Sequence, residues 1–320
     1  MGGDRGPARA VSWQLKVLRV VLRAAVKPSL RRQRDSYTAR RAFETGAWIN
    51  ARGRRFWTAF HDAPLGAVPA LWTEQPGAGG ALVLYFHGGG YVTGSPRTHA
   101  PLARQLARRA GVPLCLPDYR LAPDHPFPAA FDDAVAAWEG LLARGHAPGR
   151  IVLAGDSAGG GIALALLGRL CATNAPRPAG VVAFSPFVDL TYSGASITEN
   201  AAHDILLPVE RLETLRARIL QGADPTDPRI SPLFADFPGA PPVLIQAART
   251  EILRDDATRM AERLRGFGAE VRCDIWGNLP HAWQFFPGWL PEARAAIAQA
   301  GGFIAERLAA PPRASDHGPV

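Results

Sequence analysis

The glycine-rich stretch from Gly155 to Gly160 constrains this 320-residue chain more than any other feature. It follows the apolar run 151–154 and leads directly into small apolar residues. A strand, a serine between glycines and then a helix is the layout of a nucleophile elbow, which holds its serine in a strained conformation. Gly155 and Gly159 are needed because a Cβ at either position would collide with the neighbouring strand or helix. We therefore expect Ser157 at the carboxyl edge of a sheet, over a helix N-terminus.

A second glycine cluster lies upstream, directly after the apolar run 81–86 and one histidine. Three consecutive glycines leave backbone N–H groups uncovered, so that these groups can converge on one spot. The oxyanion of an acyl-transfer intermediate needs such a convergence of donors. Ala158, the residue after the serine, is expected to supply a further N–H. We therefore expect Gly88, Gly89, Gly90 and Ala158 to form an oxyanion hole, in which Gly88 shapes the loop.

With these two motifs the chain resembles the hormone-sensitive-lipase-like family of α/β-hydrolase carboxylesterases. Other matching stretches are Asp118–Ala130, Ser185–Leu190, Ser231–Leu233 and Pro280–Gln284. The resemblance covers roughly residues 80–305. It implies an α/β-hydrolase fold and a serine esterase that hydrolyses short- to medium-chain carboxylic esters or lactones through an acyl-enzyme intermediate. The alternatives are a non-catalytic ligand-binding protein on the same fold, or an amidase or lipase with the same triad.

Strands alternate with helices from residue 72 onward, which predicts a mostly parallel central sheet covered by helices on both faces. The expected strands are 82–86, 112–117, 151–154, 180–184, 243–247 and 270–275. The expected helices are 97–110, 129–143, 158–172, 255–267 and 292–308.

The N-terminal segment is expected to form two helices. Residues 13–27 place apolar side chains at helical spacing with Lys and Arg between them, and Pro28 is expected to end this helix. Its apolar positions are Leu15, Leu18, Val21, Leu22 and Ala25. A second helix is expected from residue 36 to about residue 51.

The resemblance also implies a division into a cap and a catalytic body. Residues 1–60 are expected to supply cap helices, and an insertion near 188–221 is expected to supply the rest of a helical cap. The α/β-hydrolase domain is expected over 61–310. The first ten residues and the tail 311–320 are expected to be disordered.

A serine hydroxyl needs a base to take its proton. His281 is the candidate, because it follows the last expected strand and so reaches the same sheet edge as Ser157. The third member of a triad orients and stabilises the imidazole, and it is expected between the serine and the histidine in the chain. Aligning Leu253 with the family pattern Asp-Pro-Leu implies that Glu251 is the acid. Asp255, at the start of the next helix, is the alternative.

The amino-acid composition limits the cofactors, membranes and other partners that can be expected for this chain. The three cysteines are scattered and predict no disulfide framework, so a reducing cytoplasm is expected. No cofactor and no metal are expected, and no transmembrane segment, because no run of about 20 apolar residues occurs.

Of the net charge of +8, residues 1–60 contribute 14 Lys and Arg against three Asp and Glu. Without a recognised nucleic-acid-binding module, this basic segment favours a solvated face or a weak contact with anionic membranes. A homodimer is implied by the resemblance alone.

Overall fold

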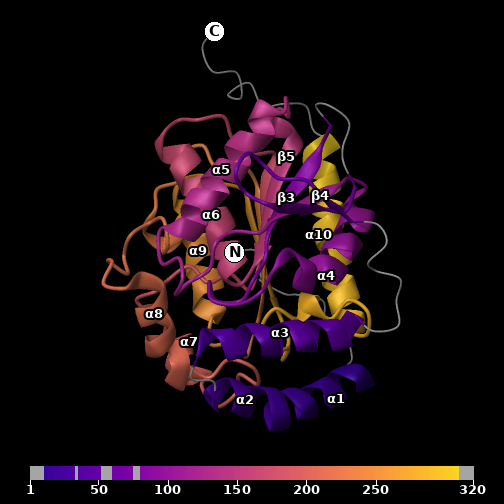
Figure 1. Cartoon of the computed structure of the whole chain (residues 1–320), viewed down its shortest axis with the longest axis vertical. Coiled ribbons are helices and arrows are strands. Elements are labelled where there is room, and N and C mark those ends of the chain that lie inside the picture. Colours follow the sequence, from indigo (N-terminus) through magenta and orange to yellow (C-terminus); the bar gives the residue numbers. More distant parts are fainter. Residues whose placement is uncertain (1–10, 33–34, 52–59, 75–79, 310–320) are drawn as a thin grey trace.

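The computed structural model describes residues 11–32, 35–51, 60–74 and 80–309 (Figure 1). The expected disorder of the first ten residues and of the tail 311–320 concerns residues outside this described part. At its centre is an eight-stranded sheet with the order β1-β2-β4-β3-β5-β6-β7-β8. The pairs β1–β2 and β2–β4 are antiparallel, and all other neighbours are parallel. The prediction of a mostly parallel sheet is confirmed.

The strands of the sheet lie close to their expected positions. They are β1 His61–Asp62, β2 Ala70–Trp72, β3 Leu82–Phe86, β4 Leu114–Pro117, β5 Ile151–Asp156, β6 Gly180–Phe184, β7 Val243–Ala248 and β8 Val271–Trp276. The antiparallel strands β1 and β2 were not expected from the sequence, because two and three residues are too few to show an alternating pattern. They extend the sheet beyond its parallel part.

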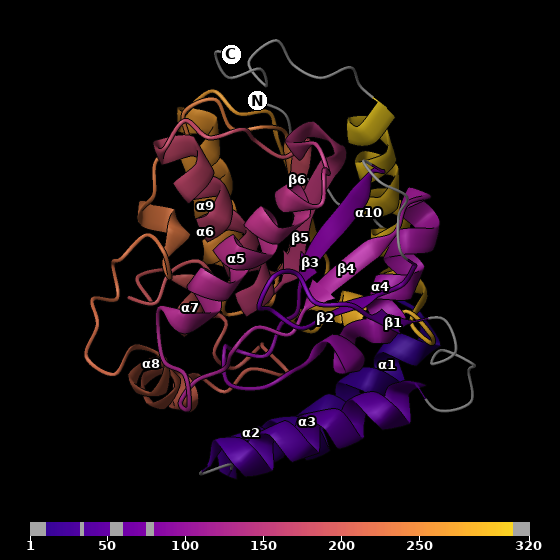
Figure 2. The same cartoon turned by 45° about the horizontal axis from the view of Figure 1, so that its top comes forward.

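Helices cover both faces of the sheet, as Figures 1 and 2 show. One face carries α4 Pro96–Ala110 and α10 Pro291–Ala309, and the other carries α5 Ala129–Ala143, α6 Ala158–Ala172 and α9 Arg254–Gly266. Successive strand residues point to opposite faces, so Val83 and Tyr85 pack under α4 and α10, whereas Leu82 and Leu84 pack on the other side. Because both faces are covered, the strands are continuous apolar runs, and β5 is buried throughout.

The N-terminal helices lie together at one end of the molecule, beside α7 Ser196–Glu199 and α8 Leu212–Leu220 (Figure 1). The first helix is α1 Trp13–Val21, which continues through a π-helical turn, η1 Leu22–Val26, into α2 Lys27–Arg32. Helix α3 spans Ser36–Ala51. The prediction that Pro28 ends the first helix is therefore wrong. The wider π-turn ends at Val26, and Pro28 is the second residue of α2. A proline is tolerated at the start of a helical segment because its missing N–H is not needed there.

Helix α1 packs on the carboxyl ends of the last two strands. Leu15, Leu18 and Leu22 join a buried cluster with Ala248 and Trp276, the last residues of β7 and β8. This packing places the N-terminal segment directly above the sheet edge at which a parallel α/β fold carries its site.

Candidate active site

The turn between β5 and α6 has the strained geometry that the glycine pattern predicted. Ser157 has φ 52° and ψ −121°, in a region that non-glycine residues rarely adopt. A Cβ on Gly155 would lie 2.4 Å from the carbonyl group of Gly159, and a Cβ on Gly159 would lie 2.1 Å from the carbonyl oxygen of Phe86. Both contacts are with backbone, which cannot move aside, so the predicted need for glycine at the two positions is confirmed.

Three polar side chains from separate loops meet at the carboxyl edge of the sheet. His281 Nε2 lies 2.8 Å from Ser157 Oγ, and His281 Nδ1 lies 2.7 Å from Glu251 Oε2. His281 is 5% exposed and Glu251 is fully buried, whereas Ser157 is partly exposed. This arrangement lets the imidazole take a proton from the serine while its other nitrogen donates to the carboxylate.

Glu251 rather than Asp255 lies beside His281. Asp255 accepts the N–H of Ser196 at 2.9 Å and pairs with Arg254 at 2.8 Å. It stands in the first turn of α9, where a carboxylate interacts favourably with the helix dipole. Asp255 therefore has partners of its own and takes no part in the contact with the imidazole.

The environment of His281 changes the proton affinity of its ring. Burial disfavours the charged imidazolium, but the charge of Glu251 and its hydrogen bond outweigh this effect and raise the pKa of His281 above its usual 6.5. Asp204 and Asp156 add to this increase from farther away. A raised pKa makes the imidazole a stronger base towards the serine proton.

The glycine loop after β3 contains two backbone N–H groups that are left without a backbone partner in the described part of the chain. Gly89 and Gly90 have φ values of 125° and 61°. Neither donates a backbone hydrogen bond within the described residues. Ala158 is the first residue of α6, so its N–H has no partner within the helix. The N–H of Gly88 differs, because it donates to Asp156 Oδ1 at 3.0 Å. Gly88 thus shapes the loop, and the donors that remain for a ligand are those of Gly89, Gly90 and Ala158.

The carboxylate of Asp156 holds the glycine loop in place through hydrogen bonds. Besides the N–H of Gly88, its carboxylate accepts the hydroxyl of Tyr85 at 2.8 Å and lies 3.4 Å from His99 Nε2. Burial alone would raise the pKa of Asp156, but the charge and hydrogen bond of His99 and the hydrogen bond from Tyr85 hold it below its usual 3.8. His87 also contacts this loop, because its Nδ1 lies 2.9 Å from the carbonyl oxygen of Gly88. Burial lowers the pKa of His87 to about 3, so its ring is neutral.

Sequence reasoning missed the residues that hold the Glu251 loop. Ser185 donates to Glu251 Oε1 at 2.7 Å, and Asn200 Nδ2 donates to the backbone carbonyl of Glu251 at 2.7 Å. The N–H of Ile252 donates to Asp204 Oδ2 at 3.0 Å. A signal existed for Ser185, which directly follows β6 as Ser157 follows β5, and so stands at the same edge. Residues 200 and 204 lie between β6 and β7, far from either strand, so the sequence offers no such strand end there.

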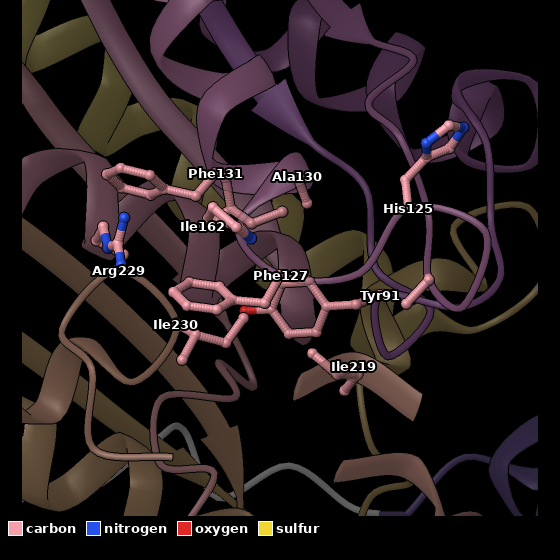
Figure 3. Close-up of a pocket in the computed structure, with 11 residues that line it drawn as sticks. Tyr91, His125, Phe127, Ala130, Phe131, Ile162, Ile219, Arg229 and Ile230 are labelled. Atoms are coloured by element: carbon pink, nitrogen blue, oxygen red, sulfur yellow. The ribbon is translucent and has the colours of Figure 1, made fainter. Parts of the chain in front are cut away.

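A small cavity of about 10 Å³ lies near the glycine loop (Figure 3). Its lining is mostly apolar and also includes His125 and Arg229. Its lining includes Tyr91, which directly follows the glycine loop, and Ile162 in the first turns of α6. This volume holds about one water molecule. Ser157 and His281 are not part of the lining, so this cavity is distinct from the space beside the triad.

In the described ranges, no three or more His, Cys, Asp or Glu side chains are arranged to hold a metal ion. The three cysteines are buried. Within the same ranges, the helices are all too short or too polar to cross a membrane.

Comparisons with known proteins agree with this fold. The model of the α/β-hydrolase fold family matches residues 83–285. The chain is 42% identical to an acetyl-hydrolase from Streptomyces hygroscopicus over 75% of this chain and 80% of that protein. It is 37% identical to an esterase from Acinetobacter venetianus over 69% of this chain and 74% of that protein. The crystal structure of an esterase from the bacterial hormone-sensitive lipase family has a TM-score of 0.85 and 37% identity, and the match covers 94% of this chain and 100% of that one. The chain therefore belongs to the α/β-hydrolase family, and within it to the hormone-sensitive-lipase-like esterases.

Proposed function

We propose that this protein is a serine carboxylesterase that uses Ser157, His281 and Glu251 as its triad. The observation that carries the proposal is the unbroken chain of short contacts from Ser157 Oγ through both nitrogens of His281 to Glu251 Oε2. The similarity to proteins named esterase and acetyl-hydrolase supports the same reaction class, hydrolysis of a carboxylic ester.

In the proposed mechanism, Ser157 Oγ attacks the ester carbonyl while His281 Nε2 takes its proton. The carbonyl oxygen becomes an oxyanion, which accepts hydrogen bonds from the N–H groups of Gly89, Gly90 and Ala158. His281 then protonates the leaving alcohol, and the acyl group remains on Ser157. A water molecule attacks this acyl-enzyme, again with His281 as base, and releases the carboxylic acid and the free serine.

Glu251 acts on the imidazole in this proposal and does not touch the substrate. Its carboxylate accepts from Nδ1, which leaves Nε2 of the neutral ring as the proton acceptor facing the serine. It also stabilises the imidazolium that forms in each transition state. The burial of Glu251 supports this role, because a charge interaction is stronger where water is excluded.

We propose short- to medium-chain esters or lactones as substrates and residues 1–60 with 188–221 as a cap. Leu215 on α8 supports the proposed short- to medium-chain substrates. A methyl group added to Gly90 would lie 3.4 Å from the side chain of Leu215. An apolar side chain from the insertion therefore stands beside the proposed oxyanion donors and limits the space there. The similarity to an acetyl-hydrolase also favours a small acyl group.

The test is hydrolysis of p-nitrophenyl esters from acetate to decanoate, together with a few lactones. Ser157→Ala is expected to lower kcat by about 10⁴-fold or more. Ser29→Ala, on the exposed side of α2, is the matched control and is expected to leave kcat unchanged. Undiminished hydrolysis by the Ser157 variant would overturn the proposal.

A further inference from the structure

Helix α1 has two apolar stripes on opposite sides, and only one of them is covered. Leu15, Leu18 and Leu22 face the body of the molecule and are buried. Trp13 and Val20, on the other side, are 64% and 67% exposed. Because each residue turns the helix by about 100°, positions 13, 17, 20 and 21 form one continuous stripe. The three valines of this stripe are exposed, and the ring of Trp13 meets Trp289 with its edge but stays largely exposed.

This stripe is the main apolar feature on the described surface. The exposed large hydrophobic side chains there are Val11, Trp13, Val17, Val20, Val21, Tyr37 and Phe234. Five of these seven fall within residues 11–21, and only Phe234 lies outside the N-terminal segment. Isolated exposed apolar side chains are ordinary, but a contiguous group marks a surface that contacts something apolar.

Basic side chains flank the stripe. Lys16 and Arg23 are exposed on one side of it. Residues 11–32 hold six Lys and Arg and no Asp or Glu. Outside residues 1–60 the chain has 22 basic and 25 acidic residues, so positive charge is concentrated in this segment.

We propose that this exposed stripe of α1 docks on the surface of an anionic lipid bilayer. An apolar stripe flanked by Lys and Arg on a helix too short and too charged to span the bilayer is the pattern of a helix that lies in the interface. The valines and Trp13 enter the boundary between headgroups and acyl chains, and the basic residues pair with lipid phosphates.

Charge argues against a second copy of the chain as the occupant. Two copies joined through this stripe would bring Lys16 and Arg23 of one close to the same residues of the other. Like charges held together in this way oppose association, whereas an anionic lipid surface neutralises them.

The docking surface lies directly above the loop that carries His281. Arg19 donates a hydrogen bond to the carbonyl of Asn278, and the buried side of α1 packs on Trp276 and Leu279. Only helix α1 would therefore separate a bound bilayer from the loop that carries His281. This inference goes beyond the proposed hydrolysis and does not depend on it, since docking requires no chemistry at Ser157.

The experiment is flotation of the full-length protein with vesicles of phosphatidylcholine alone or mixed with phosphatidylglycerol. We expect binding only to the mixed vesicles, and loss of binding as salt is added. Lys16→Glu with Arg23→Glu is expected to weaken binding by about 25-fold or more. Its matched control, Arg108→Glu with Arg169→Glu, makes the same change in net charge on exposed positions elsewhere.

Val17→Asp with Val20→Asp tests the apolar stripe and is expected to weaken binding by a similar factor, whereas Phe234→Asp is its control. The α1 variants and their two controls are expected to hydrolyse soluble p-nitrophenyl butyrate at the parent rate, whereas Ser157→Ala is expected to lose hydrolysis and to bind vesicles normally. Absence of binding by the parent protein, or equal binding by the α1 variants, would overturn the proposal. Light scattering would also overturn the proposal if the parent protein were a dimer and the valine variants were monomers. A second copy of the chain would then cover the stripe.

Discussion

Ser185 donates its hydroxyl hydrogen to Glu251 Oε1 over 2.7 Å, the oxygen that His281 does not use. The same hydroxyl oxygen accepts the N–H of Ala282, the residue after His281, at 3.2 Å. Ser185 is fully buried at the end of β6. One side chain thus fixes the position of both the proposed acid and the loop of the proposed base.

Ser185→Ala is expected to lower kcat with little change in KM. A hydrogen bond to a charged group contributes about 1.5–3 kcal/mol, so its loss predicts a decrease of roughly 10- to 100-fold if the misplaced Glu251 affects only the transition state. Ser231→Ala is the control, because Ser231 is also fully buried and its Oγ accepts the N–H of Leu190, away from the triad. An equal loss of kcat in both variants would assign Ser185 a purely structural role.

The pH dependence of hydrolysis is expected to report His281. The imidazole must be neutral to accept a proton, so kcat/KM falls as the pH drops through its pKa. Because Glu251 raises this pKa above 6.5, the acid limb is expected to have its midpoint above 6.5. Glu251→Gln removes the negative charge, so the midpoint of the residual activity is expected to move to lower pH. A midpoint that does not move would exclude Glu251 as the partner of the base.

Gly159→Ala is expected to prevent formation of the elbow. Its Cβ would lie 2.1 Å from the carbonyl oxygen of Phe86, a contact that only backbone movement relieves. We expect a loss of at least about 3 kcal/mol in the free energy of unfolding, measured by urea denaturation. Gly302→Ala, at an exposed position in α10 with open space around it, is expected to stabilise the protein by about 0.5–1 kcal/mol. Equal stability of the two variants would contradict this account of the turn.

Lys27→Met is expected to loosen the proposed cap. Lys27 is buried, and its Nζ donates to the backbone carbonyls of Ala201 and Asp204. The Asp204 carboxylate in turn accepts the N–H of Ile252, next to Glu251. Loss of these bonds is expected to lower the free energy of unfolding by about 1–3 kcal/mol and to lower kcat. Lys16→Met, on the exposed side of the same segment, is the control; a similar effect there would contradict the role of the buried amine.

Local patterns in the sequence predict the central sheet and the helices that cover it. Helices 129–143 and 158–172 and strands 82–86 and 180–184 have the bounds expected, because long apolar runs and small-residue helices show clear periodicity. The N-terminal helix was only partly predicted. Val21 was expected on the buried side with Leu18 and Leu22, but it is 47% exposed, since a hydrophobic pattern does not tell which of two apolar stripes is covered.

The residues of the site also fall into two groups: those in local motifs, which the sequence predicts, and those placed by contacts that are distant in the chain. Ser157, Gly89 and Gly90 stand in local motifs, so the sequence predicts their geometry. Whether Glu251 or Asp255 meets the imidazole depends on the path of a loop, which the sequence does not reveal. Asn200 and Asp204 act on a loop about 50 residues away in the chain, and nothing in their own surroundings indicates that contact. The predicted homodimer and cytoplasmic location stay predictions.

The most direct test of the central claim is the mass of the protein after reaction with a fluorophosphonate, which phosphonylates an activated serine. We expect one adduct per chain, and peptide mapping is expected to place it on Ser157. The variant His281→Ala is expected to stay unlabelled, because the hydroxyl of Ser157 then has no base to take its proton. A protein that stays unlabelled, or an adduct on another residue, would contradict the claim that Ser157 is the nucleophile.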